Sequence, residues 1–221
     1  MLPNWKKWLS YLTPVHLETT GSAINDVLEV YLVRNRLRLT THDAIYSYDD
    51  QYLNYTKTFK MLNLPADGAE VLILGFGLGS IPIMLEKKFK KKYNYTAVEI
   101  DETVLSLFSR YQMPRLNSPL EMHQGDAAQF MRTQTRQYNI ICVDVFVGEF
   151  VPDHLKEDEF LENLKRAVAP DGLILWNMLY DTEFQKNEVN HFAGQIFSKY
   201  FPEAFTYVIM GNIIIMNKSG F

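Results

Sequence analysis

Val71-Leu72-Ile73-Leu74-Gly75-Phe76-Gly77-Leu78-Gly79-Ser80 is the stretch that decides the fold. Its apolar first half predicts a buried strand, and the glycines that follow predict a tight turn into a helix beginning near Ser80. Gly75 is free to take a positive φ, and Gly77 lets a ligand approach the backbone closely. The first amides of such a helix have no partner within it, so they point at whatever the turn holds.

A second strand, Thr96-Ala97-Val98-Glu99-Ile100-Asp101, follows this turn and ends in carboxylates. In an open α/β sheet an acid at this place holds the ribose hydroxyls of a nucleoside. A lone Gly-x-Gly-x-Gly is weak evidence for a nucleoside site, because glycines at such turns also serve close packing. The glycine turn followed by Glu99 is stronger evidence, and together they predict an enzyme that binds a nucleoside cofactor.

Two more strand ends carry carboxylates. Gly125-Asp126 follows the third expected strand, where Asp126 can accept a hydrogen bond from an adenine amino group or cap the helix that begins near Ala127. The fourth strand ends in Asp144. Because open parallel sheets bind ligands beyond the carboxyl ends of their strands, Asp144 is expected to meet a substrate amine or act as a general base. A capping role in the turn is the alternative for Asp144.

Strands and helices alternate through most of the chain. We expect strands at 70–75, 95–100, 119–123, 139–144 and 172–177, with helices at 80–89, 102–111, 126–133, 157–168 and 185–201. This order predicts a mostly parallel sheet covered on both faces. Residues 205–210 and 212–217, joined through Gly211, predict a closing antiparallel hairpin. The pattern is that of a Rossmann-like, class I methyltransferase-like α/β fold.

The first 49 residues differ from the rest. Period-two alternation at 27–32 and 36–41 predicts a β-hairpin, and 44–48 predicts a third strand. We therefore expect a small hairpin region over 1–49 and a nucleoside-binding domain over 50–221. A helix over 49–62 would carry Tyr52, Tyr55, Phe59 and Leu62 on one face. The hairpin also offers an edge strand through which two copies can pair, so a homodimer is one option.

Composition argues against several classes of ligand and of protein. The net charge of −4 gives no electrostatic case for a nucleic-acid ligand. The five histidines show no metal-ligand spacing, so no metal is expected, and the lone Cys142 excludes an intramolecular disulfide. There is no long apolar run for export or for crossing a bilayer, so we expect a cytoplasmic protein that does not bind membranes.

These residues resemble the S-adenosylmethionine-dependent transferases, and specifically the spermidine synthase family. The likeness runs from the hairpin near Val27 to about Trp176. It implies S-adenosylmethionine or its decarboxylated form as cofactor, and a small-molecule acceptor. It also implies roles for individual residues: Gly75, Gly77, Gly79, Glu99 and Asp126 would bind the cofactor, and Asp144 would be catalytic with help from Tyr52.

The chain departs from the family where the acceptor would bind. In the family, a gate loop follows the fourth strand and carries a second carboxylate, and Val147 stands at that position here. The family's pocket histidine is replaced by Leu53, and a glutamine of its hairpin aligns near Arg38. Holding a polyamine out of water needs several carboxylates, and the stretch at 145–150 is largely apolar. We therefore expect an acceptor other than putrescine, and we place a methyltransferase or other transferase ahead of a true spermidine synthase.

Two further classes stay open. Gly75-x-Gly77-x-x-Ser80 followed by Glu99 is close to a dinucleotide fingerprint, which fits an NAD-dependent oxidoreductase. The closing antiparallel hairpin and Asp126 argue against an oxidoreductase. A non-catalytic protein that kept the nucleoside pocket and lost turnover would show the same rebuilt gate.

Overall fold

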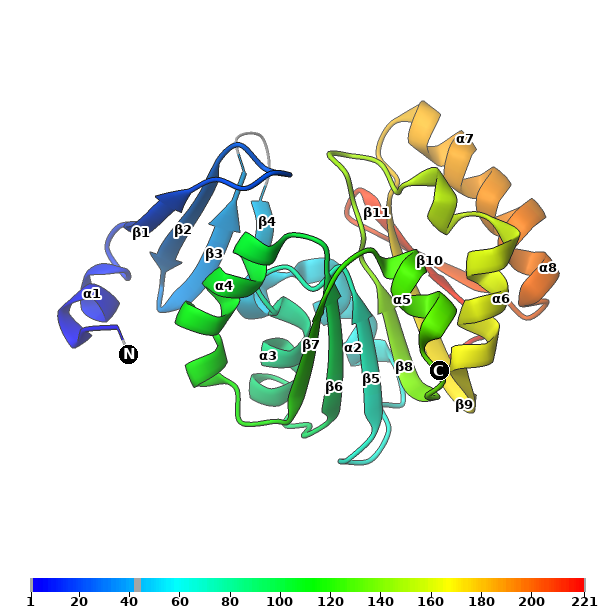
Figure 1. Cartoon of the computed structure of the whole chain (residues 1–221), viewed down its shortest axis with the longest axis horizontal. Helices are drawn as coiled ribbons and strands as arrows, with labels where there is room; N and C mark the ends of the chain where they lie inside the picture. The colour runs from blue at the N-terminus through cyan, green and yellow to red at the C-terminus, as the bar shows by residue number, and fades with distance from the viewer. Residues whose placement is uncertain (1, 42–44, 221) are drawn as a thin grey trace.

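The computed structural model describes residues 2–41 and 45–220. These residues form a four-stranded antiparallel sheet from the N-terminal part of the chain and a seven-stranded, mostly parallel sheet from the remainder (Figure 1). Helices cover the larger sheet on both sides, and the smaller sheet lies at one end of the molecule beside helices α3 (Ser80–Lys87) and α4 (Glu102–Tyr111).

The seven-stranded sheet confirms the expected α/β fold. Its strands are β5 (Glu70–Leu74), β6 (Asn94–Glu99), β7 (Leu120–Gln124), β8 (Tyr138–Val143), β9 (Val168–Leu179), β10 (Phe205–Ile209) and β11 (Asn212–Met216). They lie in the order β10-β11-β9-β8-β5-β6-β7, and β11 is antiparallel to both of its neighbours. The order reverses direction between β5 and β8, and such a switch point opens the crevice in which these sheets bind ligands.

Burial explains the apolar run that precedes the glycine turn. Val71, Leu72, Ile73 and Leu74 of β5 are all 0% exposed. Val71 and Ile73 belong to one hydrophobic core, while Leu72 and Leu74 belong to a second core on the other face of the sheet. A parallel strand with a core on each face needs apolar side chains at every position.

The remaining helices follow the expected alternation, with one departure. They are α5 (Ala127–Thr133), α6 (Asp158–Ala167), α7 (Glu183–His191) and α8 (Ser198–Tyr200). The single helix expected over 185–201 is instead α7, a π-helical segment (Phe192–Phe197) and α8. It begins earlier because Thr182 and Gln185 form a capping box. Among the described residues, no helix is long and apolar enough to cross a membrane.

The expected helix over 49–62 is also divided. A single 3₁₀ turn (Asp49–Gln51) precedes α2 (Leu53–Met61), because Tyr52 between them takes an extended conformation (φ −73°, ψ 90°) that a continuous α-helix does not allow. Tyr55 and Phe59 are buried on the face that the spacing predicts.

The N-terminal hairpin is confirmed as β2 (Leu28–Val33) and β3 (Arg36–Thr40), but it is part of a larger sheet. Strand β4 (Ile45–Tyr48) is the expected third strand, and residue 44 lies outside the described residues. Strand β1 (Val15–Thr20) and helix α1 (Asn4–Leu9) were not predicted. β1 escapes detection because Glu18 and the threonines after it interrupt the apolar alternation, and a bulge shifts its register.

Polar contacts attach the small sheet to the large one beside the glycine turn. The hydroxyls of Ser47 and Ser80 lie 2.7 Å apart, and Arg115 forms an ion pair with the buried Asp49 at 2.8 Å. Ser22 donates a hydrogen bond to Asp101 at 2.5 Å. Because these partners lie at the starts of α3 and α4 or just after α4, they hold β4 and the β1–β2 connection against the part of the large sheet that carries the glycine turn.

Gly75 should be required by the fold itself, whatever it binds. Its φ is +80°, and a Cβ there would overlap the carbonyl oxygen of Asp144. Gly68 has a similar φ of +85° but open space around it. We expect Gly68→Ala to cost about 1–2 kcal/mol for the left-handed conformation, and Gly75→Ala to cost about 1–3 kcal/mol more for overpacking. Urea unfolding of both variants measures the difference, and equal losses would contradict this packing role.

Candidate active site

The three glycines of the turn have different surroundings. All three have positive φ, at 80°, 54° and 71° for Gly75, Gly77 and Gly79. A Cβ on Gly79 would lie 2.5 Å from the ring of Phe108, so Gly79, like Gly75, is needed for internal packing. A Cβ on Gly77 would meet nothing closer than 3.6 Å. Of the three, Gly77 is therefore the glycine whose surroundings leave room for a ligand.

Glu99 holds this turn in place from the end of β6. Its side chain is 2% exposed, one carboxylate oxygen accepts the Gly77 amide at 2.8 Å, and the other accepts the Asp101 amide at 3.1 Å. Burial raises the pKa of Glu99 despite these bonds. The structure thus brings together Gly77 and Glu99, as the sequence predicts.

The chemistry around Glu99 suits a ribose. Burial and the nearby Glu99 carboxylate raise the pKa of Tyr46 on β4. Each carboxylate oxygen has two acceptor sites and gives only one to a backbone amide. A carboxylate with acceptor sites left over is the group that vicinal ribose hydroxyls require, so the residues present fit a nucleoside.

Asp126 occupies the expected strand end but has a structural role there. It is the N-cap of α5, where Oδ1 accepts the Gln129 amide at 3.0 Å and Oδ2 lies 3.0 Å from Nε2 of His154. Burial acts to raise the pKa of Asp126, but the Gln129 amide and His154 outweigh it and lower that pKa. An adenine contact for Asp126 stays a prediction. Among the described residues, no three His, Cys, Asp or Glu side chains gather closely enough to hold a metal ion.

Asp144 and Tyr52 meet at the end of β8. The Tyr52 hydroxyl donates to Asp144 Oδ1 at 2.9 Å, and Asn177 Nδ2 donates to the same oxygen at 2.8 Å. Burial raises the pKa of Asp144 to about 6, although the bonds from Asn177 and Tyr52 act to lower it. The pairing of a half-buried acid with a tyrosine is the arrangement expected from the sequence, and their catalytic roles stay predictions.

Three asparagines complete this network, and sequence reasoning missed all of them. Asn177 lies on β9 and is 1% exposed; its Oδ1 accepts Asn54 at 3.2 Å and Asn212 at 3.1 Å. With its oxygen engaged twice, the amide nitrogen of Asn177 is directed at Asp144. The available signal was a lone amide in the apolar strand Leu-Ile-Leu-Trp-Asn177-Met, because a buried polar side chain must find partners.

The gate that follows Asp144 is an apolar turn. Val147 and Phe150 pair through their backbones, with the Val147 amide donating to the Phe150 carbonyl at 2.8 Å. Val147 is 66% exposed, and the exposed Phe150 ring lies 6.4 Å from the ring of Phe184 at the start of α7. Leu53, at the position of the family's histidine, is also exposed. The acid within this turn is the exposed Glu149.

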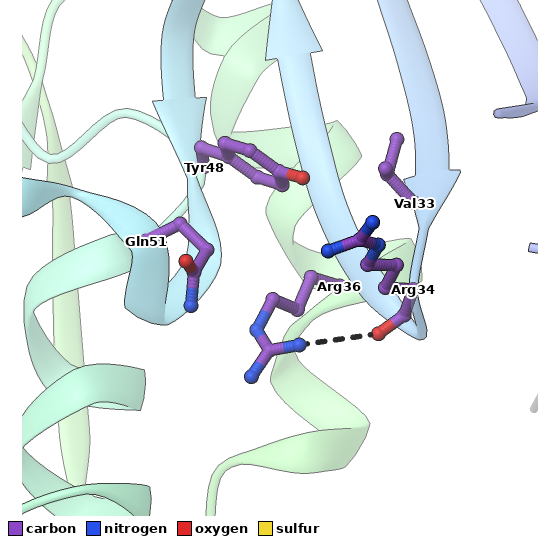
Figure 2. Close-up of a pocket in the computed structure, with 5 residues that line it drawn as sticks. All are labelled: Val33, Arg34, Arg36, Tyr48 and Gln51. Carbon is purple, nitrogen blue, oxygen red and sulfur yellow. Dashed lines mark hydrogen bonds between the residues drawn. The ribbon is translucent and has the colours of Figure 1, made fainter. Parts of the chain in front are cut away.

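Arg38 lies apart from this site. Its guanidinium is 5.3 Å from the ring of Tyr31 and 5.9 Å from that of Tyr48, across the small sheet. The same sheet carries a cavity of about 460 Å³, whose lining residues do not include the candidate site residues. Figure 2 shows this cavity, with Arg36 donating to the carbonyl of Arg34 beside Tyr48. The cavity is therefore separate from the carboxyl ends of β5 to β8.

Because the pKa of Asp144 is raised in the folded state, the free energy of unfolding should fall as the pH rises above about 4. An aspartate ionises near pH 3.9 when unfolded, so in wild type the unfolded state ionises first and stability falls as the pH rises to about 6. The amide introduced by Asp144→Asn does not titrate. The advantage of Asp144→Asn over wild type should therefore grow by up to about 3 kcal/mol between pH 4 and 7.5, at 1.36 kcal/mol per pKa unit.

Urea unfolding across this pH range measures the effect. Asp153→Asn is the matched control, because Lys156 lowers the pKa of the exposed Asp153 and the sign of its pH dependence should be opposite. A stability difference for Asp144→Asn that does not change with pH would show that Asp144 ionises normally.

Parts of the chain are similar in sequence to known enzymes. A polyamine aminopropyltransferase of Vibrio vulnificus (strain CMCP6) is 31% identical over 121 residues, which cover 51% of this chain and 40% of that protein. The first three curated relatives are matched over only 25–42% of their own length.

Solved structures agree with the fold. A probable spermidine synthase from Corynebacterium glutamicum superposes with a TM-score of 0.68 at 18% identity, covering 91% of this chain and 78% of that one. A spermidine synthase in complex with the transition-state analogue AdoDATO gives the same TM-score at 15% identity, covering 91% and 72%. Residues 55–215 match the spermine/spermidine synthase domain. The chain therefore belongs to the spermine/spermidine synthase domain family.

Proposed function

We propose that the protein transfers a group from a nucleoside sulfonium, S-adenosylmethionine or its decarboxylated form, to a small amine that carries one positive charge. The single observation that supports this most is the position of two carboxylates at the ends of β6 and β8, the strands on either side of β5. Glu99 lies at the glycine turn, and Asp144 lies beyond β8 with Tyr52 and Asn177 bonded to it. One acid suits ribose hydroxyls and the other suits an ammonium.

The chain's own residues would act as follows. Gly77 and Glu99 bind the nucleoside, and when bound the sulfonium supplies a carbon that a nucleophile can attack. Asp144 accepts the proton that the amine loses as its nitrogen forms the new C–N bond and the C–S bond breaks, leaving a neutral thioether. Asn177 and Tyr52 keep Asp144 oriented, and positioning supplies much of the rate.

The surroundings of Asp144 favour an acceptor with one amine over an acceptor with two. Asp144 is surrounded by neutral donors, Tyr52 and Asn177, and the gate beside it presents Val147 and Phe150. A second ammonium would lie beside these apolar side chains, and the acid of the gate, Glu149, is exposed to water, so the loss of hydration would be poorly compensated. We place methyl transfer first for this reason. Aminopropyl transfer is the second candidate, because several relatives are named polyamine aminopropyltransferases.

Binding of 5′-methylthioadenosine should depend on Glu99. Glu99→Gln keeps the shape but replaces a charged acceptor, and a hydrogen bond to a charged group is worth about 1.5–3 kcal/mol. We expect the dissociation constant to rise roughly 10- to 150-fold in calorimetry. Glu102→Gln, which alters an exposed carboxylate at the start of α4, is the matched control and should bind like wild type. Unchanged affinity in Glu99→Gln would remove Glu99 from the nucleoside site.

Putrescine should be a poorer acceptor than n-butylamine, which has the same chain length and one ammonium fewer. With either donor, we expect kcat/KM for putrescine to be at least about tenfold lower, a difference of about 1.4 kcal/mol. Val147→Asp should reduce the difference in kcat/KM between the two amines, because it adds a carboxylate to the gate. The assay is run beside the Vibrio vulnificus aminopropyltransferase. Turnover of putrescine that equals that relative's would contradict the monoamine proposal and favour the second candidate.

A further inference from the structure

Large apolar side chains stay exposed around the Asp144 network. They come from the start of α2, the gate that follows β8, the start of α7 and the turn between β10 and β11. The five side chains, which we call the apolar rim, are Leu53, Val147, Phe150, Phe184 and Met210, and they are between 43% and 67% exposed. Single exposed apolar residues are ordinary on a protein surface, whereas several gathered beside one buried acid are typical of a ligand-binding groove.

Leu53 is held close to the acid by its two neighbours in the chain. The Tyr52 hydroxyl donates to Asp144 at 2.9 Å, and the Asn54 amide donates to Asn177 at 3.2 Å. Both neighbours are bound into the network, while the side chain of Leu53 between them is exposed. The start of α2 therefore contributes an apolar group directly beside the network.

The turn between β10 and β11 is attached to the same network. Asn212, at the start of β11, donates to Asn177 at 3.1 Å, and Met210 lies two residues before it. The carbonyl of Gly211 accepts the Tyr180 amide at 2.7 Å, which joins this turn to the segment that leads into α7. Figure 1 shows the gate, the start of α7 and this turn at one end of the molecule.

An apolar contact joins the gate to α7. The Phe150 ring lies 6.4 Å from the Phe184 ring at an angle of 81°, an edge-to-face arrangement between two rings that are both more than half exposed. The backbone pairing of Val147 with Phe150 fixes the turn that carries the first ring. The rim is therefore a set of positioned side chains from four segments rather than a scatter of surface residues.

We infer that the apolar rim binds the uncharged tail of the acceptor, and that the acceptor is a primary amine with an unbranched apolar chain. The inference rests on the proposed function, in which the ammonium meets Asp144. Tyr52 and Asn177 enclose Asp144, so the rest of the acceptor extends toward the side chains that stay exposed. An apolar tail that covers these side chains removes apolar surface from water on both partners.

The charges near the rim favour such a tail over a second ammonium. Glu149 in the gate and Asp181 before α7 are both exposed to water. Glu183, at the start of α7, is paired with Lys186 at 2.9 Å. Exposed carboxylates contribute little to the binding of a cation, because water already solvates both partners. These acids therefore do little to hold a second ammonium, whereas the rim itself offers apolar area.

Isothermal calorimetry with a series of amines tests the inference, with 5′-methylthioadenosine bound at saturation. From n-propylamine to n-hexylamine, the dissociation constant should fall about fourfold for each added methylene, as the burial of a CH₂ group predicts. 3-Methoxypropylamine has the size of n-pentylamine, with an oxygen in place of one methylene. It should bind at least about tenfold more weakly than n-pentylamine, because the rim leaves the ether oxygen without a partner.

Two variants assign this chain-length dependence to the rim. Phe150→Ser and Phe184→Ser each remove an exposed ring, and each should reduce the gain to about twofold or less per methylene. Met61→Ser is the matched control, because it alters an exposed apolar residue at the other end of α2, and it should keep the wild-type dependence. Urea unfolding of each variant checks that the fold is retained.

Assays of methyl and aminopropyl transfer to the same amines separate this inference from the proposed function. A chain-length dependence that both phenylalanine variants reduce supports the inference, and its presence without transfer would contradict the proposed reaction alone. Transfer without chain-length dependence would overturn the inference and leave the proposed reaction standing. A dependence that survives in both variants, or an absence of amine binding, would also overturn the inference.

Discussion

The buried carboxylate of Glu99 is the contact on which the candidate site depends. It ties the amide of Gly77 to the end of β6, and the turn between β5 and α3 takes its shape from that tie. Burial disfavours the charged form, so the carboxylate needs the hydrogen bonds that the Gly77 and Asp101 amides supply. Each oxygen keeps a further acceptor site, and the hydroxyls of a ribose would suit those sites.

The two halves of the site are joined by one close backbone crossing. Gly75 passes so near the carbonyl of Asp144 that a side chain there would overlap it, and the Asp144 amide donates to Leu74 at 2.8 Å. This crossing places the Glu99 turn, from β5 and β6, beside the Asp144 network, from β8, β9 and α2. The residues of the gate lie outside the crossing. The gate can therefore vary without disturbing the Glu99 turn.

The fold could be predicted because the sequence patterns that indicate it involve residues close together in the chain. The glycines, the apolar runs and the alternation of elements depend on neighbours in the chain, and β5 to β9 lie where these patterns indicate. The pairing of Glu99 with Gly77 followed from the rule that strand ends share one edge, whereas the pairing of Asp144 with Tyr52 was expected from the resemblance to the spermidine synthase family. Asn54, Asn177 and Asn212 could not be found this way, because residues 54 and 177 meet only through the packing of α2 on the sheet. β1 was hidden by its bulge and its polar residues, and α1 by its short length.

Calorimetric titration of the wild-type protein with S-adenosylmethionine, decarboxylated S-adenosylmethionine and NADH tests the central claim most directly. If the Glu99 turn is a sulfonium-nucleoside site, at least one of the first two ligands binds with one-to-one stoichiometry and NADH does not. The tighter of the two identifies the transferred group as methyl or aminopropyl. Binding of NADH alone, or of none of the three, would contradict the assignment.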